Sequence, residues 1–335
     1  MSFSNGNVIQ LVKRQSTQIE AVRLSSLPPA PLGVRMGWGV AGENTQGCAT
    51  SQAAMIKAGL AWEVSKEDVY DAQGKTLPDM HIMRRLDNGA VCGTVGGRYT
   101  PLQNAEAFAF FDPFVRSGEL TYEKAGSFRG GAWVWIQAKL AGGGADIVKG
   151  DEVTPYLTLS HSHDGTLAVS VGFTPIRIVC QNTMLMSRLS GTNLVVRHTK
   201  NMAVTLDAIR ETVDTVKRTF AMSSEQFRHL ASLGCDGSGL DSYVKAVFGK
   251  DDSDADKTRF LRTRNDIVRL FETGAGADIV GVRGTMWGAY NAVIEYLQYE
   301  SGNKTANDVS RLEKLAFGTN NDVGQRAFAL AMGIA

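Results

Sequence analysis

The chain has 335 residues, of which 43% are hydrophobic and 21% are charged, and this composition is ordinary for a soluble globular protein. Its 35 Lys and Arg residues nearly balance 34 Asp and Glu residues, which gives a formal net charge of +1. A uniformly basic nucleic-acid-binding chain is therefore excluded, and any contact with nucleic acid needs a local cationic surface.

The cysteines and the apolar runs indicate where the protein resides. The four cysteines, Cys48, Cys92, Cys180 and Cys235, are far apart and form no Cys-x-x-Cys pair. This spacing fits neither a zinc cage nor a disulfide framework, so we expect reduced thiols. No apolar run approaches the ~20 residues that a membrane-spanning helix needs, and no secretory signal is visible at the start. We therefore expect a cytoplasmic protein without a membrane partner.

The order of sequence patterns predicts three regions. Residues 1–45 contain the stiff segment Pro28-Pro29-Ala30-Pro31 and are interpreted as an N-terminal arm, with a poorly ordered tail as the alternative. Residues 46–200 are expected to form an α+β core. Residues 201–335 are expected to form a helical C-terminal domain, because strand patterns end near residue 201.

The core pattern begins with a predicted helix over residues 49–61 and a strand over 62–70. A second helix is predicted over 104–115, and its apolar stripe should lie on a sheet. Turn residues predict three hairpins, at Asp87-Asn88-Gly89, at Arg129-Gly130-Gly131 and at His163-Asp164-Gly165. The expected fold class is α+β, with a largely antiparallel sheet and helices packed on one side.

The apolar spacing becomes helical after residue 201. Helices are predicted over residues 204–222, 240–248, 258–271, 285–299 and 325–332. Ser223-Ser224-Glu225 is expected to end the first of these helices and to cap another one. The antiparallel sheet is thus expected to precede a mostly helical C-terminal region.

A cationic, amide-rich segment follows the last predicted core strands. The chain has no Asp or Glu from Thr166 to Thr205, and a segment of this kind can bind phosphates. The residues that we expect to contact nucleic acid are Arg177, Gln181, Asn182, Arg188, Arg197, His198 and Lys200. Nearby aromatic residues could stack on bases, namely Tyr99, Trp133, Trp135, Tyr156 and Phe173. The alternative is an ordinary solvated face on which acids of the helical region pair with these cations.

His161 and His163 form the most metal-like pattern in the chain. On a strand they project to one face, where two imidazoles can share a zinc or manganese ion. The sequence indicates no third ligand, and the alternative is a polar strand end before an Asp-Gly turn. Cys180 and His198 could form a thiol and its base, although the apolar neighbours of Cys180 favour a buried cysteine. We expect no catalytic residues, no metal and no cofactor.

Four segments together resemble the phage/plasmid-like protein family of unknown function. These segments are Tyr99-Thr100-Pro101-Leu102-Gln103-Asn104, Arg177-Ile178-Val179-Cys180-Gln181-Asn182-Thr183-Met184, Arg197-His198-Thr199 and Trp287-Gly288-Ala289-Tyr290-Asn291-Ala292-Val293-Ile294-Glu295-Tyr296. The resemblance runs from about Ala41 to the end of the chain. It implies a protein encoded on prophages, phages or plasmids, and it assigns no catalytic residue.

The predicted order of elements is also similar to that of the ring-forming single-strand annealing proteins, which hold single strands of phage and plasmid DNA in a basic groove during recombination. We therefore expect a mobile-element DNA-binding protein that acts in single-strand annealing or recombination. Its expected partner is single-stranded DNA, and a homo-oligomer, possibly a ring, is expected. Two alternatives stay open. One is a metal-dependent enzyme acting on nucleic acid or nucleotides through His161 and His163, and the other is a host-interaction or anti-defence protein whose partner face is residues 202–335.

Overall fold

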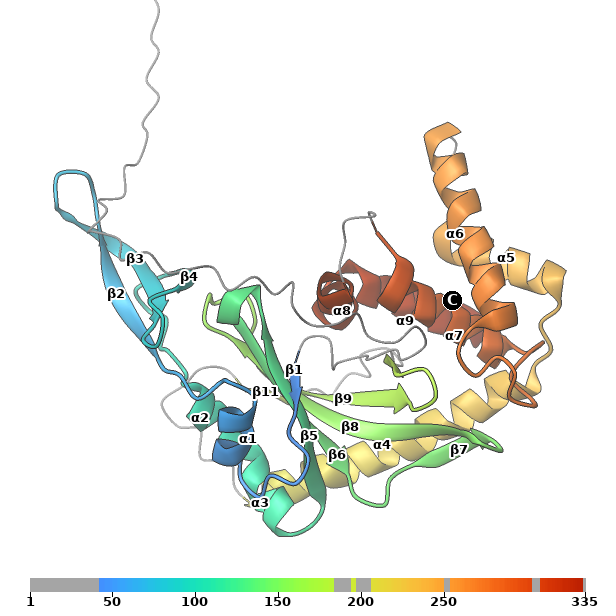
Figure 1. Cartoon of the computed structure of the whole chain (residues 1–335), viewed down its shortest axis with the longest axis horizontal. Helices are drawn as coiled ribbons and strands as arrows, with labels where there is room; N and C mark the ends of the chain where they lie inside the picture. The colour runs from blue at the N-terminus through green and yellow to red at the C-terminus, as the bar shows by residue number, and fades with distance from the viewer. Residues whose placement is uncertain (1–41, 184–193, 197–205, 250–253, 303–307, 334–335) are drawn as a thin grey trace, which may run out of the picture.

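The computed structural model describes residues 42–183, 194–196, 206–249, 254–302 and 308–333. In these residues an antiparallel, strongly curled sheet precedes a helical region, as Figure 1 shows. The predicted α+β class is therefore confirmed. Most of the predicted N-terminal arm lies outside the described residues, and so does the boundary predicted near residue 201.

The main sheet contains eight strands within the described part of the chain, and all of its pairs are antiparallel. Its path runs through β1 (Gly42–Asn44), β5 (Leu120–Phe128), β6 (Trp133–Leu140), β8 (Asp151–Ser162), β9 (Val169–Arg177) and β10 (Asn182–Thr183). β7 (Ala145–Val148) pairs with β8, and β11 (Leu194–Val196) pairs with β9. The hairpins predicted at residues 129–131 and 163–165 join β5 to β6 and β8 to β9, as expected.

The two faces of this sheet differ in character. Side chains alternate along a strand, so Val134 and Ile136 of β6 share one face while Trp133 and Trp135 share the other, as the sequence predicts. We call these the Val134 face and the Trp133 face. The Val134 face forms an apolar core with the short helices that surround β5. One end of the Trp133 face is covered by a C-terminal helix through Leu312 and Phe317.

A second, three-stranded sheet projects from the main body (Figure 1). It consists of β2 (Val64–Tyr70), β3 (Thr76–Arg85) and β4 (Val91–Val95), and the hairpin predicted at Asp87-Asn88-Gly89 joins its last two strands. Arg85 attaches this sheet to the body, because its guanidinium lies 4.1 Å from the centroid of the Trp62 ring and donates to the carbonyl of Gly130 over 3.0 Å.

Short helices lie between the two sheets in sequence. They are α1 (Ser51–Lys57), α2 (Asn104–Phe108), a 3-10 turn (Ala109–Phe111) and α3 (Asp112–Arg116). The continuous helix predicted over 104–115 is therefore wrong in detail. Pro113 has no N–H to donate to a preceding carbonyl, so the chain changes to a 3-10 turn and starts a new helix with proline in its first turn. The predicted apolar stripe still packs, since Phe108, Phe111 and Phe114 are all buried.

The helical region consists of α4 (Leu206–Ser232), α5 (Gly237–Phe248), α6 (Asp254–Thr273), α7 (Met286–Glu295) with a π-helical turn η5 (Tyr296–Glu300), α8 (Asp308–Phe317) and α9 (Thr319–Ala331). The helix end predicted at residues 223–225 is wrong. Ser223 and Ser224 donate their hydroxyls to the carbonyls of Thr219 and Phe220, so α4 continues through them. Among the described helices, none has the length and apolar content of a membrane span.

Sheet and helical region share one hydrophobic cluster. Ile147 and Val153 from the sheet pack with Phe227 of α4 and with Trp287 and Tyr290 of α7. Burial of such large side chains contributes on the order of 1.5–3 kcal/mol each, so the two parts stabilise one another.

Asp112 joins three elements and provides a first test of the fold. Its carboxylate accepts hydrogen bonds from the Ser51 amide (2.6 Å), the Ser51 hydroxyl (2.8 Å) and the Tyr122 phenol (2.8 Å). We predict that Asp112→Ala lowers the free energy of unfolding by about 2–4 kcal/mol, because several charge-assisted hydrogen bonds are lost together. Tyr122→Phe removes only one of them and should cost about 1 kcal/mol in urea denaturation. Equal losses for the two variants would contradict this account.

Candidate functional site

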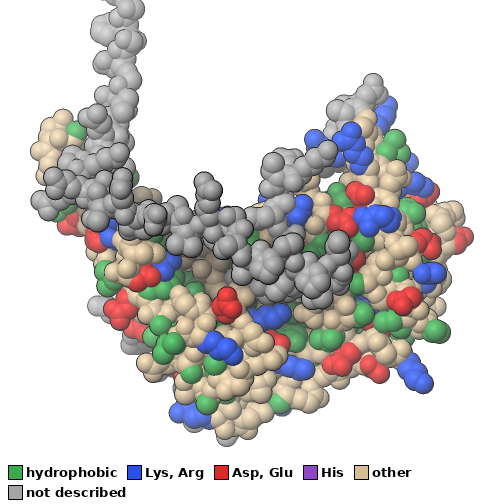
Figure 2. Space-filling view, viewed as in Figure 1, with side chains coloured by type: hydrophobic (Ala, Val, Ile, Leu, Met, Phe, Trp, Pro, Cys, Tyr) green, Lys and Arg blue, Asp and Glu red, His purple; other side chains and the backbone are tan. Residues whose placement is uncertain are grey.

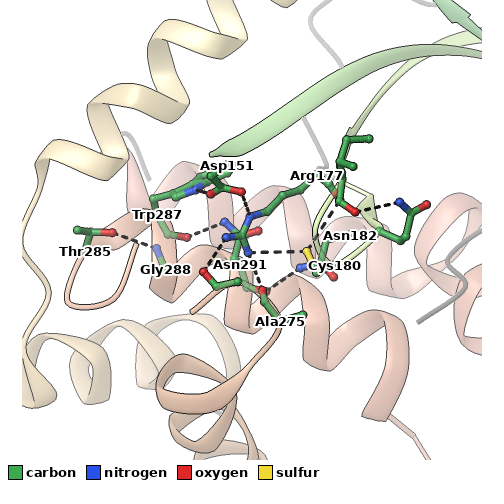
Figure 3. A network of polar contacts seen from close by, with 12 residues as sticks. Asp151, Arg177, Cys180, Asn182, Ala275, Thr285, Trp287, Gly288 and Asn291 are labelled. Atoms are coloured by element: carbon green, nitrogen blue, oxygen red, sulfur yellow. Dashed lines mark hydrogen bonds and ion pairs between the residues drawn. The ribbon is translucent and has the colours of Figure 1, made fainter. Parts of the chain in front are cut away.

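Arg177, the first cation of the predicted nucleic-acid site, lies at the end of β9 inside the protein. Its side chain is only 1% exposed, and that of Asp151 at the start of β8 is fully buried. The Arg177 Nε atom lies 2.7 Å from Asp151 Oδ1, and the two residues form a buried ion pair (Figure 3). The antiparallel pairing of β8 and β9 brings them together, since Arg177 is in register with Val153.

The remaining polar atoms of this ion pair are also satisfied. Arg177 Nη1 and Nη2 donate to the carbonyls of Ala275 and Gly276 over 3.1 and 3.2 Å, and Trp287 Nε1 donates to Asp151 Oδ2 over 2.8 Å. A Cβ atom at position 276 would lie 2.8 Å from Arg177 Nη2. The backbone φ of Gly276 is +75°, and this conformation also favours glycine. We call Asp151, Arg177 and Trp287 the polar lock, because they join the sheet to the helical region.

In the polar lock, the positive charge of Arg177 is paired with the carboxylate of Asp151. A buried cation whose donors all have partners is not placed to meet a phosphate, so the structure gives Arg177 a structural position rather than a surface one. Cys180 lies beside it, with Arg177 Nη1 donating to its sulfur over 3.7 Å. Burial raises the pKa of the Cys180 thiol to about 11, so this thiol is protonated at neutral pH and is a poor nucleophile.

Gln181 lies in the turn that follows the lock, and Asn182 begins β10. Gln181 has a left-handed backbone (φ +56°) and its side chain donates to the carbonyl of Ile178 over 3.0 Å. Asn182 is buried and donates to the carbonyl of Asn291 on α7 over 3.3 Å. Gln298 of η5 accepts from the Thr183 amide and donates to the carbonyl of Gln181, both over 3.0 Å. These amides therefore fasten the turn to α7 and η5.

The structure brings together three of the seven predicted site residues, Arg177, Gln181 and Asn182. The other four, Arg188, Arg197, His198 and Lys200, lie outside the described residues. The described strand β11 lies between them in sequence and pairs with β9, with Val196 opposite Val169. In sequence, Arg188 lies between β10 and β11, and the other three residues lie between β11 and α4.

Sequence reasoning missed the partners of these residues. Asp151, Trp287, Asn291 and Gln298 contact Arg177 or the turn after it, and the predicted site contained none of them. One signal was available, because residues 287, 291, 295 and 298 follow helical spacing and place polar groups on one side of an otherwise apolar segment.

The His161–His163 pair lies side by side, as the strand pattern predicts. Both imidazoles are buried, their ring centroids are 4.9 Å apart, and His163 Nε2 lies 3.0 Å from Asn104 Oδ1 on α2. The ring of Trp62 packs against His163 with a centroid distance of 5.3 Å. Within the described ranges, no group of three or more His, Cys, Asp or Glu side chains could hold a metal ion. The described surroundings of the pair are those of packed core residues.

The tryptophans proposed as stacking platforms are also packed. Trp133 donates its indole N–H to Asp164 and Thr166, and its ring meets Phe317 of α8 at a centroid distance of 5.6 Å. Trp135 is fully buried beside Phe128. Neither ring therefore presents a free face for a base.

Comparison with known proteins places the chain in one family. The family model for DUF932, a domain of unknown function, matches residues 91–316, which is well over half of the chain. The chain therefore belongs to the DUF932 family, and the match includes the polar lock and β11. No curated protein and no solved structure matches the chain significantly.

The polar lock provides a second test. Arg177→Met leaves the Asp151 carboxylate buried without its cation, so we predict a loss of about 3–5 kcal/mol in the free energy of unfolding. Arg262→Met is the matched control, since Arg262 is exposed on α6, and it should change stability by about 0.5 kcal/mol or less. Urea denaturation of both variants measures the difference. Similar stabilities would show that the ion pair does not hold the two regions together.

Proposed function

We propose that this member of the DUF932 family binds single-stranded DNA and acts as a homo-oligomeric annealing or recombination factor of a mobile genetic element. The observation that carries the proposal is the distribution of charge. Residues 165–206 contain no acidic residue, and once Arg177 is paired with Asp151 they still carry Arg188, Arg197 and Lys200. In a chain that is nearly neutral overall, this segment is a local cationic excess.

The described ends of this segment support the proposal. β10 and β11 both pair with β9, so Arg188 lies in sequence between two strands of the sheet, and Arg197 and Lys200 lie between β11 and α4. Attachment lowers the conformational entropy that is lost when Arg188, Arg197 and Lys200 contact successive phosphates. His198 and the amides of the same segment would add hydrogen bonds to the sugar–phosphate chain.

The order of the sheet and helix elements is the reason for proposing single-stranded DNA as the ligand. An antiparallel sheet followed by the long helix α4 has an element order similar to that of ring-forming single-strand annealing proteins. Element order alone does not define a function, so the charge distribution remains the main argument. Annealing would require binding and release of strands, and it would assign no catalytic role to the buried histidines.

The salt dependence of binding tests the proposal. Each phosphate contact on a single strand contributes about 0.7 to the slope of log affinity against log salt concentration. The triple variant Arg188→Gln, Arg197→Gln, Lys200→Gln should therefore lower the slope for a fluorescent oligothymidylate by about 2, and weaken binding at low salt.

The matched control makes the same change of charge elsewhere. Lys245→Gln, Arg259→Gln, Arg262→Gln removes three exposed cations from α5 and α6 and should leave the slope unchanged. If the native chain does not bind the oligonucleotide at low salt, or if both variants lower the slope equally, the proposal is wrong.

A further inference from the structure

A cleft separates α4 from the loop that joins β6 to β7. α4 runs beside β7, as Figure 1 shows, and the cleft between the helix and the loop has a volume of about 600 Å³. Small molecules bind to proteins in pockets of ~300–1,000 Å³, so this cleft has the size of a ligand site. Residues 140–145 form one wall, and residues of α4 between Lys217 and Arg228 form the other. We call it the α4 cleft.

Both walls of the α4 cleft are held in place by the protein. Arg228 Nε and Nη2 donate to the carbonyl of Asp146 on β7 over 3.2 and 3.1 Å, so α4 is fixed to the strand that follows the loop. The loop packs closely on β8, since a Cβ atom at position 143 would lie 2.7 Å from Pro155 Cγ. A ligand would therefore meet a cleft that is already formed, and this lowers the entropy that is lost on binding.

The α4 wall of the cleft is accessible and mainly apolar. Lys217, Phe220 and Ala221 lie on one side of the helix, because they are three or four residues apart. Ala221 is exposed, and Met222 beside it is 59% exposed. A methionine side chain is flexible and adapts to apolar ligands of different shapes. The cleft thus offers an apolar surface to a ligand that arrives from solvent.

Lys217 gives the α4 cleft its charge. Glu225 and Arg228 also line the cleft, and they neutralise one another because Arg228 Nη1 donates to Glu225 Oε1 over 2.6 Å. The side chain of Lys217 is exposed and forms no ion pair or hydrogen bond with any residue that the structure describes, including Asp214 one turn earlier. The cleft therefore has one ammonium group available, which suits a ligand with one negative charge.

We propose that the α4 cleft binds a small carboxylic acid with an apolar body. The carboxylate lies beside the Lys217 ammonium, and the apolar body lies on Ala221 and Met222. A phosphate ester fits the cleft less well, because it carries a charge of about −1.5 to −2 at neutral pH and the lining has one cation without a partner. This binding requires no nucleic acid, so the inference goes beyond the proposed function and does not depend on it.

Methyl NMR locates the site in the unmodified chain. The full chain would be isotope-labelled at its methionine methyl groups and titrated separately with phenylbutyrate and with octanoate, and Met222→Leu would assign the Met222 resonance. This resonance should shift in a saturable way, because the acid contacts the side chain, while that of Met55, which is buried in α1, should not move. If neither acid shifts the Met222 resonance at millimolar concentration, the inference is wrong.

Two substitutions test the contacts of the acid. Lys217→Gln should weaken the binding of phenylbutyrate about fivefold, because the exposed ion pair with the carboxylate is lost. Ala221→Trp should weaken it more than about tenfold, because the larger side chain fills the apolar part of the cleft. Arg218→Gln is the matched control. Arg218 follows Lys217 on α4, is exposed and does not line the cleft, so its loss should leave the affinity unchanged.

The midpoint of urea denaturation checks that the three variants fold, and each should match the native chain because the substituted residues are exposed. Equal losses of affinity in Lys217→Gln and Arg218→Gln would show a general effect of charge and contradict the inference. Unchanged binding to Ala221→Trp would also contradict it. If Lys217→Gln weakens the binding of oligothymidylate as well, the cleft belongs to the nucleic-acid site, so this inference is wrong and the proposed function stands.

Discussion

The buried ion pair between Arg177 and Asp151 is the interaction on which the rest of the structure depends. It joins the end of β9 to the start of β8, and through Trp287 and the carbonyls of Ala275 and Gly276 it holds the helical region against the sheet. Two charges are tolerated in a core because each is paired and fully hydrogen-bonded. Separate contacts hold the residues that follow the lock, since Asn182 donates to the carbonyl of Asn291 and the Thr183 amide donates to Gln298.

Because Arg177 is buried, the proposed contacts with phosphates depend on the other cations of the same segment. In the proposed function, Arg188, Arg197 and Lys200 would supply the charge, and they belong to a segment without acids. Contacts of this kind weaken as the salt concentration rises, because each cation that neutralises a phosphate releases bound counterions.

Much of the sheet could be predicted because its signals are local. Asn-Gly, Gly-Gly and Asp-Gly turns set the hairpins, and alternation along β6 correctly placed Trp133 and Trp135 on one face. The burial of Arg177 could not be predicted from such local signals. Its cationic neighbours in sequence suggested a surface, whereas its acid lies 26 residues earlier and meets it only when β8 and β9 are paired. The burial of Trp133 likewise depends on Phe317, which is far away in sequence.

Crosslinking to DNA tests the central proposal most directly, which is that a single strand contacts the cationic segment. A photoreactive oligothymidylate bound to the native protein would be irradiated, and the modified peptides would be identified by mass spectrometry. Crosslinks are expected in peptides from residues 184–205. Crosslinks confined to α5, α6 or the projecting sheet, or none at saturating oligonucleotide, would contradict the proposal.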